Sequence, residues 1–313
     1  MRPVPNFLKP RTEQGWLSVG LREGRADFVH IRREPGRKPV VLLADSVGKG
    51  ADDAATLGAL RRPMRLDRYR CTALLTHGKY QLIQTDAVAG APDEAREVMR
   101  WKLKDQVEFP VDTAAIDLLP IPSDGRATQV FVALSPESVI APLVQAFQAA
   151  RVPLAAIDLP EMSQRNLAAL FEEDGRGLAT LIFDDDEGLL TFTQNGELLV
   201  VRHVEITAPQ LITADAERRS ALFERIALDV QRSLDNFDRM YSAIQLSNIL
   251  VAPIPGIDGF LGYLRANLTV SVVPLDLSGV MDLGAVPGLL DPLRQFQCLR
   301  ALGAALRDEP EPA

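Results

Sequence analysis

Hydrophobic positions recur along this chain with two periods. Short apolar or alternating runs bounded by Gly, Pro, Asn or Asp predict β-strands, and apolar residues three or four positions apart predict amphipathic helices. Strands are predicted at 16–20, 26–31, 39–44, 71–76, 80–88, 113–121, 127–134, 152–157, 178–183, 188–193, 197–206, 243–252 and 268–275. Helices are predicted at 52–60, 92–107, 135–150, 161–171, 215–240, 259–266 and 292–306. Strands interleaved with helices indicate an α/β fold.

The most definite local pattern lies between residues 178 and 206. An acidic turn, Asp184 to Glu187, joins the first two apolar runs, and Asn195-Gly196 joins the second run to the third. Asn-Gly between apolar runs predicts a type I′ hairpin, because both residues accept a positive φ. The segment is therefore predicted to be a three-stranded meander with a carboxylate at its first turn.

The block from 80 to 134 has the order strand–helix–strand–strand. The predicted apolar face of its helix comprises Ala95, Met99, Leu103 and Val107. Val98 and Trp101 are left on a flank, and Pro110 disfavours helical geometry at Phe109. We therefore expect a small subdomain with some apolar side chains outside its own core.

A second long helix, at 215–240, is strongly amphipathic. Its predicted buried face comprises Leu222, Ile226, Val230, Leu234 and Phe237. The Gly-rich stretch at 175–177 is the predicted boundary between two lobes. The expected organisation is a mobile lead-in (1–15), a first lobe (16–175) with an insertion at about 79–151, a second lobe (176–307) and a disordered tail (308–313).

Composition narrows the function classes. A length of 313 residues suits two lobes, and a net charge of −8 with a pI near 5.1 argues against nucleic acid as a partner. Only two cysteines occur, Cys71 and Cys298, each in an apolar segment, so we expect reduced core thiols. No apolar run reaches the ~18 residues of a membrane span, and no signal peptide is visible. A cytoplasmic protein without direct membrane insertion is expected.

Several candidate chemical motifs are weak. Gly48-Lys49-Gly50 lacks the spacing of a phosphate-binding Walker loop. His30, His77 and His203 lie too far apart in sequence for a local ligand motif, so strand-edge or loop positions and no metal site are expected. The oxygens of 184–187 could suit Mg²⁺ or Ca²⁺, but a solvated acidic turn is the preferred interpretation.

Short phrases at 98–104, 109–112, 116–117, 156–158, 226–235 and 299–306 stand in a fixed order along the chain. With the order of the predicted elements, they make residues 15 to 307 resemble the actin-like cell-division protein FtsA. The chain is more similar still to the pilus proteins PilM and MshI. This resemblance implies an α/β actin-like (ribonuclease H-like) fold of two lobes with an inserted 1C-type subdomain.

The nucleotide motifs of that family are degenerate here. The first phosphate loop, Gly-x-Asp-x-Gly, keeps only its last glycine, Gly20, and Ser18 replaces the aspartate. The second loop keeps Asp184 but has Asp186 in place of a glycine, and a carboxylate there would repel phosphate. The adenosine loop keeps Gly256 but carries two prolines. We therefore expect a pseudo-ATPase with no catalytic residues and no cofactor, with bound ATP and Mg²⁺ as the alternative.

The resemblance also implies a function. The chain would be a non-catalytic cytoplasmic scaffold of a type IV (MSHA-like) pilus assembly platform, at the inner-membrane face. It would bind the cytoplasmic tail of a single-span, PilN-like protein in a groove containing Val98, Trp101 and Phe109. An assembly ATPase and a second copy of the chain are left open as further partners.

Two alternatives stand beside this function. One is a working actin-fold ATPase that uses Asp184 despite its acidic neighbours. The other is the cytoplasmic L-type component of type II secretion, from a family that continues into a membrane span.

Overall fold

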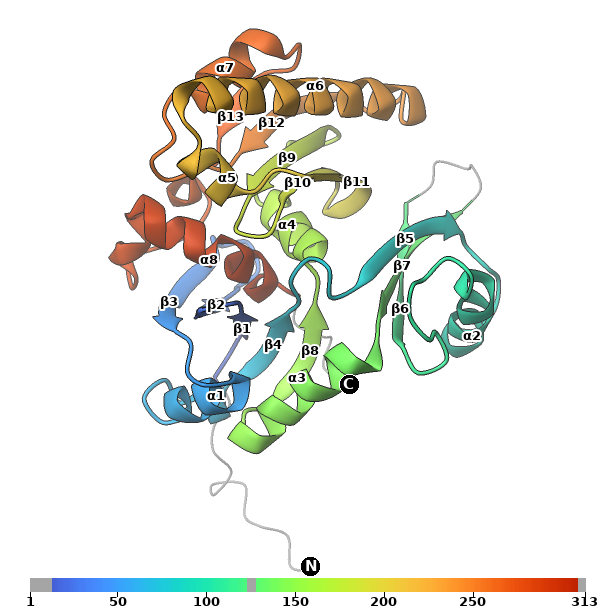
Figure 1. Cartoon of the computed structure of the whole chain (residues 1–313), viewed down its shortest axis with the longest axis vertical. Helices are drawn as coiled ribbons and strands as arrows, with labels where there is room; N and C mark the ends of the chain where they lie inside the picture. Colours follow the sequence, from blue (N-terminus) through green and yellow to red (C-terminus); the bar gives the residue numbers. More distant parts are fainter. Residues whose placement is uncertain (1–12, 123–127, 309–313) are drawn as a thin grey trace, which may run out of the picture. The chain divides into compact units, whose positions relative to one another are not determined.

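The computed structural model describes residues 13–122 and 128–308. The expected lead-in (1–15) and tail (308–313) fall almost entirely outside these ranges. The described residues form two compact units: the first comprises 13–75, Pro142–Leu159 and 278–308, and the second comprises 76–122, 128–141 and Pro160–Leu277 (Figure 1).

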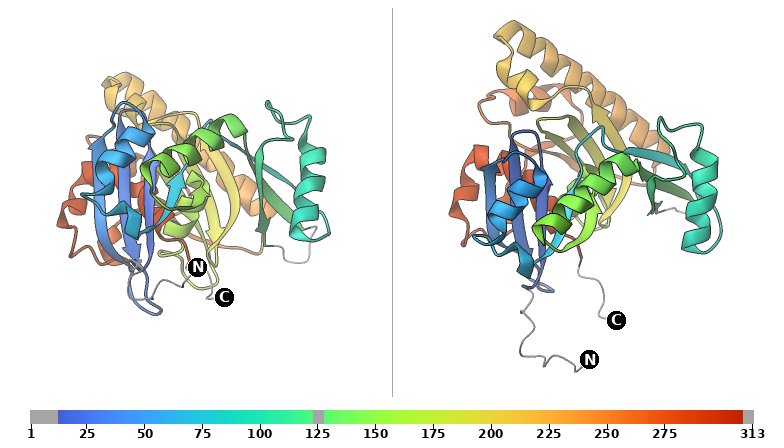
Figure 2. Two further views of the ribbon diagram at one scale, coloured as in Figure 1. Left: turned by 90° about the horizontal axis from the view of Figure 1, so that it is seen from below. Right: turned by 60° about the horizontal axis from the view of Figure 1, so that its bottom comes forward.

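The first unit is built on a five-stranded sheet. Its order is β3 (Val40–Gly48), β2 (Arg25–Arg32), β1 (Trp16–Leu21), β4 (Arg70–Leu74) and β8 (Leu154–Asp158). The three strands of the first hairpins are antiparallel, whereas β4 runs parallel to β1 and β8 parallel to β4. One face is covered by α1 (Asp53–Arg61) and α3 (Glu137–Ala150), and the other by α8 (Pro292–Ala305) (Figure 2).

Residues 278–308 return to this first sheet. The backbone of Asp282 pairs with the edge strand, accepting from Val41 N at 3.0 Å and donating to Pro39 O at 2.9 Å. The buried face of α8 includes Leu299 and Leu302. The sequence-based division had kept residues 176–307 in one lobe, so the structure assigns the last helix differently. The periodicity of a helix does not tell which sheet it covers.

Both cysteines lie in the first unit. Cys71 and Cys298 are free and buried, and burial raises the pKa of each thiol to about 12. Such thiols are almost wholly protonated at neutral pH and unreactive. The expected core thiols are confirmed.

The larger sheet of the second unit repeats the same topology. Its order is β11 (Glu197–Val204), β10 (Gly188–Gln194), β9 (Gly177–Phe183), β12 (Leu246–Val251) and β13 (Val272–Pro274). The predicted meander is confirmed, and Asn195 and Gly196 have φ values of 54° and 74°, as a type I′ turn requires. A bulge between Phe192 and Thr193 shifts the pairing of β10 with β11.

Alternate residues of β10 face two different helices, as the pleat of a strand requires. Thr191 faces α4 (Pro160–Ala168), where Gln164 Nε2 donates to Thr191 Oγ1 at 3.0 Å and to Thr180 O at 2.6 Å. Phe192 instead stacks on Phe237 of α6 (Ala216–Met240), with ring centroids 4.7 Å apart. This sheet therefore has helices on both faces.

The buried face of α6 differs from the prediction at one position. Phe223 is buried and Leu222 is only half-buried. The ring of Phe223 packs 4.8 Å from Phe260 and 5.7 Å from Tyr263, both on α7 (Phe260–Asn267). Because α6 packs against α7 as well as against the sheet, its buried face includes Phe223 in place of Leu222.

The inserted block has the predicted order. A three-stranded sheet, β5 (Gln81–Asp86), β7 (Gln129–Ser135) and β6 (Ala115–Ile121), packs with α2 (Pro92–Leu103) around Met99 and Leu103. The helix ends at Leu103 and not at 107. A longer helix would place Asp105 and Glu108 at the negative end of the helix dipole, which is unfavourable. In addition, the guanidinium of Arg100 donates to Ala114 O at 2.7 Å, which fixes the loop that follows the helix against it.

A few smaller elements complete the chain. They are the helix α5 (Ala208–Thr213), which the apolar pattern did not predict, and the 3-10 turns Leu66–Arg68, Leu277–Gly279 and Pro287–Leu290. The strand predicted at 268–275 shrinks to β13, and β3 extends to Gly48. Within the described ranges, none of the helices combines the length and apolar character required to cross a bilayer.

Candidate functional site

Ser18 and Gly20, the remnants of the first phosphate loop, lie within β1. Ser18 is fully buried, and its hydroxyl has no hydrogen-bond partner among the described residues. Gly20 pairs with Asp27 across the hairpin, and a Cβ at Gly20 would meet the Asp27 side chain at 3.8 Å, an ordinary contact. The protein atoms around Gly20 therefore leave room for a Cβ and do not themselves require a glycine there.

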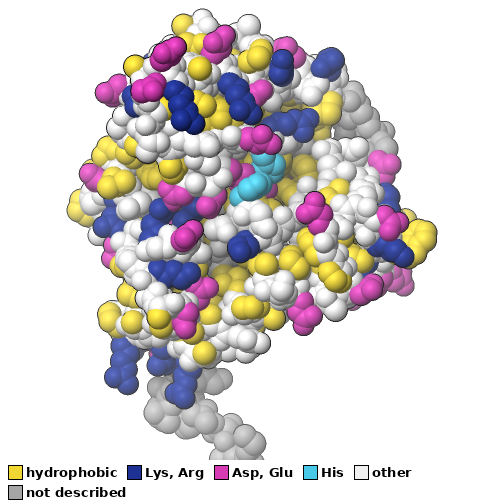
Figure 3. Space-filling view, viewed as in Figure 1, with side chains coloured by type: hydrophobic (Ala, Val, Ile, Leu, Met, Phe, Trp, Pro, Cys, Tyr) yellow, Lys and Arg dark blue, Asp and Glu magenta, His cyan; other side chains and the backbone are white. Residues whose placement is uncertain are grey.

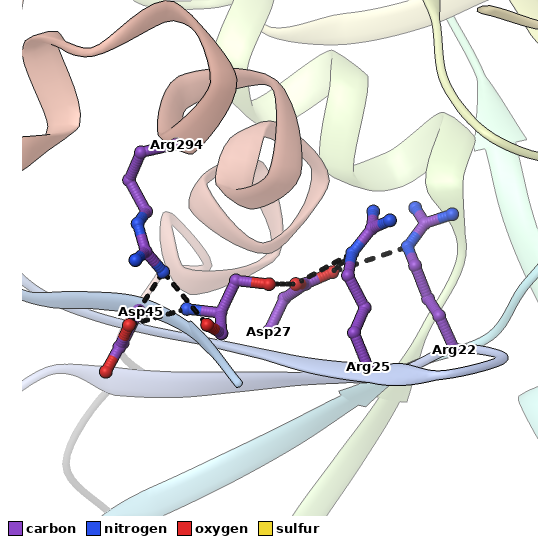
Figure 4. Close-up of polar contacts among 6 residues, drawn as sticks. Arg22, Arg25, Asp27, Asp45 and Arg294 are labelled. Atoms are coloured by element: carbon purple, nitrogen blue, oxygen red, sulfur yellow. Dashed lines mark hydrogen bonds and ion pairs between the residues drawn. The ribbon is translucent and has the colours of Figure 1, made fainter. Parts of the chain in front are cut away.

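The side chain of Asp27, opposite Gly20 in this hairpin, belongs to a network of hydrogen bonds and ion pairs (Figure 4). The Asp27 carboxylate accepts from Ser46 Oγ at 2.6 Å and from Arg25 Nε at 3.1 Å, and Arg22 Nε lies 3.5 Å away. Burial raises the pKa of Asp27, and the hydrogen bond and the two guanidinium groups oppose that shift. The sequence pattern did not predict that Arg22 and Arg25 pair with Asp27, where their positive charge offsets that of the buried carboxylate.

The acidic turn is mostly an enclosed structure. Asp184 Oδ1 accepts the backbone N–H groups of Asp186 at 2.9 Å and Glu187 at 3.1 Å. The Asp184 backbone N–H donates to Glu187 O at 2.8 Å. Asp184 and Glu187 are only 5% and 4% exposed, so the expectation of a solvated turn is wrong for both and holds only for the exposed Asp186. The Asp184 carboxylate closes its own turn, a common role for aspartate.

Gly256 follows β12 in a tight turn. Ile257 N donates to Ile254 O at 3.1 Å, and Gly256 has a φ of 74°. Proline at the second position and a positive φ at the third are the features of a type II turn. The turn itself explains this glycine, without any ligand.

The three residues predicted to hold a partner peptide differ in their surroundings. Val98 and Trp101 lie one turn apart on the outer face of α2 and are 46% and 78% exposed. Phe109 is half-buried and packs against the core of the inserted block. The structure thus leaves two of the three free to contact a partner, and Trp101 is the more exposed.

The histidines are distributed as loop and strand residues, but two of them meet. His30 lies in β2 of the first unit, 3% exposed, with Nε2 2.8 Å from Gln14 O. In the second unit the rings of His77 and His203 are 5.1 Å apart beside Glu187. Sequence separation concealed this pair, because only strand pairing in β10 and β11 brings His203 to Glu187.

Comparison with known proteins gives structural matches only. No family model and no curated protein matches the sequence. The chain is similar to a solved chain of the PilM–PilN type IV pilus biogenesis complex, with a TM-score of 0.74 and 18% identity over 95% of this chain and 99% of that one.

Two further structures match less closely. One is the cytoplasmic domain of EpsL, an inner-membrane component of the type II secretion system of Vibrio cholerae, with a TM-score of 0.51 and 14% identity over 95% of this chain and 97% of that one. The other is a Bacteroides thetaiotaomicron protein of unknown function with an actin-like ATPase fold, with a TM-score of 0.51 and 12% identity over 94% of this chain and 99% of that one. The predicted α/β actin-like fold of two lobes is confirmed.

Proposed function

We propose that this chain is a non-catalytic actin-like scaffold of a type IV pilus assembly platform. In this proposal it binds the cytoplasmic tail of a PilN-like, single-span protein and is held at the inner-membrane face by that partner. The supporting observation is the structural likeness to the PilM–PilN complex, which extends over nearly the whole of both chains. Membership of the MSHA type of platform, as an MshI-like protein, is the finer part of the proposal and rests on the sequence phrases.

The residues at the three nucleotide motifs favour a protein without catalytic activity. Ser18 cannot replace a carboxylate that helps to hold a hydrated metal ion, and it is buried. The Asp184 carboxylate is occupied by its own turn, and Asp186 adds negative charge where phosphate would need N–H donors. These features favour a pseudo-ATPase with no nucleotide cofactor over a working ATPase.

Purified protein is therefore expected neither to bind nor to hydrolyse ATP at millimolar nucleotide with Mg²⁺. Isothermal titration calorimetry and a phosphate-release assay measure the two properties. Binding at low micromolar ATP would contradict the proposal. Should turnover be seen, its loss in Asp184→Asn would support the ATPase alternative, since this variant keeps the oxygen that closes the turn.

The tail-binding surface is assigned to the outer face of α2. The buried residues of this helix, Ala95, Met99 and Leu103, serve its own core, so Val98 and Trp101 are available to a partner. Tryptophan is enriched among the residues that dominate binding energy at interfaces. An extended peptide that covers Trp101 would bury an apolar surface worth roughly 1.5–3 kcal/mol.

Titrating a synthetic peptide of the PilN-like protein's cytoplasmic tail against Trp101→Ala tests this surface. We expect binding to weaken about tenfold or more, since roughly 1.4 kcal/mol is a factor of ten. Leu228→Ala on α6 is the matched control, because Leu228 is also an exposed apolar residue of a helix, at 50%, and should leave affinity unchanged. Phe109→Ala is a poorer probe, because Phe109 also packs in the subdomain core.

Equal affinity of the wild type and Trp101→Ala would remove α2 from the interface. No binding of the tail peptide to the wild type would count against the scaffold function itself. These two outcomes separate an error in the site from an error in the partner.

A second candidate function is a cytoplasmic component of type II secretion, favoured by the likeness to the EpsL domain. Capture of the chain with its partners from detergent-treated membranes of its native cell distinguishes the two. Recovery of a pilus-platform protein supports the first function, and recovery of a secretion component supports the second.

A further inference from the structure

Four titratable side chains from separate elements converge in the second unit. Glu187 Oε2 lies 2.5 Å from His203 Nδ1 and 3.1 Å from His77 Nδ1. Glu161, on α4, has its Oε1 atom 3.6 Å from His203 Nε2. His77 precedes β5, Glu187 ends the β9–β10 turn, and His203 is in β11. The three segments that meet at Glu187 are therefore joined by side chains rather than by backbone pairing alone.

The buried carboxylate of Glu161 is oriented toward this group. Glu161 is fully buried, and its Oε2 accepts a hydrogen bond from the Tyr80 hydroxyl at 2.7 Å. Its other oxygen, Oε1, has no hydrogen-bond partner among the described residues, and neither has Glu187 Oε1. A buried carboxylate oxygen without a partner is costly, so native proteins retain one where it has a task.

The geometry suits a transition-metal ion. One nitrogen from each histidine and one oxygen from Glu187 all lie within 4.8 Å of one another. Zinc–ligand bonds of about 2.0–2.2 Å in a tetrahedral arrangement separate ligand atoms by roughly 3.3–3.6 Å. Small side-chain rotations would bring the three atoms to that spacing. Two imidazoles and a carboxylate favour zinc and its neighbours over Mg²⁺ and Ca²⁺, which prefer oxygen ligands.

We propose that His77, His203 and Glu187 bind a divalent transition-metal ion of the zinc class, and that Glu161 orients His203. In this arrangement His203 coordinates through Nδ1 and donates its Nε2–H to Glu161, whose position the Tyr80 hydroxyl fixes. Carboxylates that accept the second ring N–H of a ligating histidine are the usual outer shell of zinc sites. Glu161 and Tyr80 are thus positioning residues rather than ligands.

The site is accessible to an ion from solvent. His77 and His203 are 48% and 38% exposed, and histidine side chains reach the surface together beside carboxylates in the space-filling view (Figure 3). Three protein ligands leave a fourth position for water or for a donor from another molecule. A bound ion would tie the segment entering β5 to the turn and strand of the larger sheet. This inference stands whether or not the chain binds a pilus protein.

Histidine ring-proton NMR on the untagged full-length chain gives a test with an internal control. The chain has three histidines, and His30 is buried in the other unit. On addition of Zn²⁺ to chelator-treated protein, we expect the signals of His77 and His203 to shift with one equivalent and the signal of His30 to stay. Three unmoved signals, or movement of His30 alone, would overturn the proposal without requiring any variant to fold.

Calorimetric titration of Zn²⁺ into variants then identifies the ligands. His77→Gln, His203→Gln and Glu187→Gln should each weaken binding at least tenfold, and Glu161→Gln should weaken it less, because an amide oxygen still accepts from His203. Asp186→Asn is the matched control, an exposed carboxylate one residue from Glu187 that should leave affinity unchanged. If the His77→Gln and His203→Gln variants both bound Zn²⁺ with the affinity of the wild type, the cluster would be only a histidine–carboxylate hydrogen-bond network.

Discussion

Replacing Asp184 by alanine is expected to lower the free energy of unfolding by about 2 kcal/mol. The variant leaves the N–H groups of Asp186 and Glu187 without the acceptor that closes the turn, and an unsatisfied buried donor costs roughly 1–3 kcal/mol. Urea denaturation of the full chain, followed by far-UV circular dichroism, measures the loss.

Asp184→Asn is the matched control, because the amide retains the Oδ1 acceptor. We expect it to cost less than about 1 kcal/mol, since only the charge on the acceptor is lost. If both variants lost the same free energy of unfolding, the negative charge of Asp184, rather than its hydrogen bonds within the turn, would be the source of the stabilisation. Such a result would reopen the case for a ligand at the acidic turn.

Truncating Phe237 to alanine should have a larger effect, a loss of about 3–5 kcal/mol of folding free energy. Phe237 is fully buried, stacks on Phe192 at 4.7 Å with an interplanar angle of 11°, and lies 5.2 Å from Tyr241. Its removal opens a cavity between α6 and the larger sheet and breaks an aromatic stack. Hydrogen–deuterium exchange of peptides from β10 and α6 shows whether the loss is local.

Phe237→Leu keeps most of the volume and serves as the comparison for Phe237→Ala. It should cost less than about 1.5 kcal/mol, as volume-conserving core substitutions usually do. Faster exchange throughout the first unit, with none in α6, would show that Phe237 does not stabilise the second unit in the way its packing indicates.

Local signals predicted the meander well. Asn195-Gly196 determines a two-residue hairpin by itself, because few other dipeptides tolerate two positive φ angles. The helix α5 was missed, although Thr207 and Gln210 form a capping box that the sequence displays. In both cases the information lies within a few residues, so it is accessible without the fold.

The meeting of Glu187 and His203 could not be predicted in the same way. Without the bulge after Phe192, a two-residue turn would place Glu187 opposite Val204, and His203 would point to the other face of the sheet. The bulge shifts the register so that His203 pairs with Leu189 and shares a face with Glu187. The extra position is Leu199 in β11, and its residue type does not mark it as a bulge. His77 and Glu161 come from segments distant in sequence.

The surface of α2 is an intermediate case. The spacing of Met99 and Leu103 correctly indicated which side of the helix is buried, and therefore that Trp101 lies off it. Whether the rest of the protein covers Trp101 depends on neighbouring elements that the helical period does not describe. Phe109 was predicted to face a partner peptide, but it packs against the core of its own subdomain, and the sequence pattern did not indicate this contact.

The return of α8 to the first sheet has a consequence for synthesis on the ribosome. About 240 residues separate the end of β3 at Gly48 from the start of α8 at Pro292, which translation at roughly 5–20 residues per second needs about 12–50 s to produce. During that interval one face of the nascent sheet lacks its covering helix. The second unit ends at Leu277 and can close before α8 exists. The part of the protein whose sequence emerges first is therefore the part that finishes folding last.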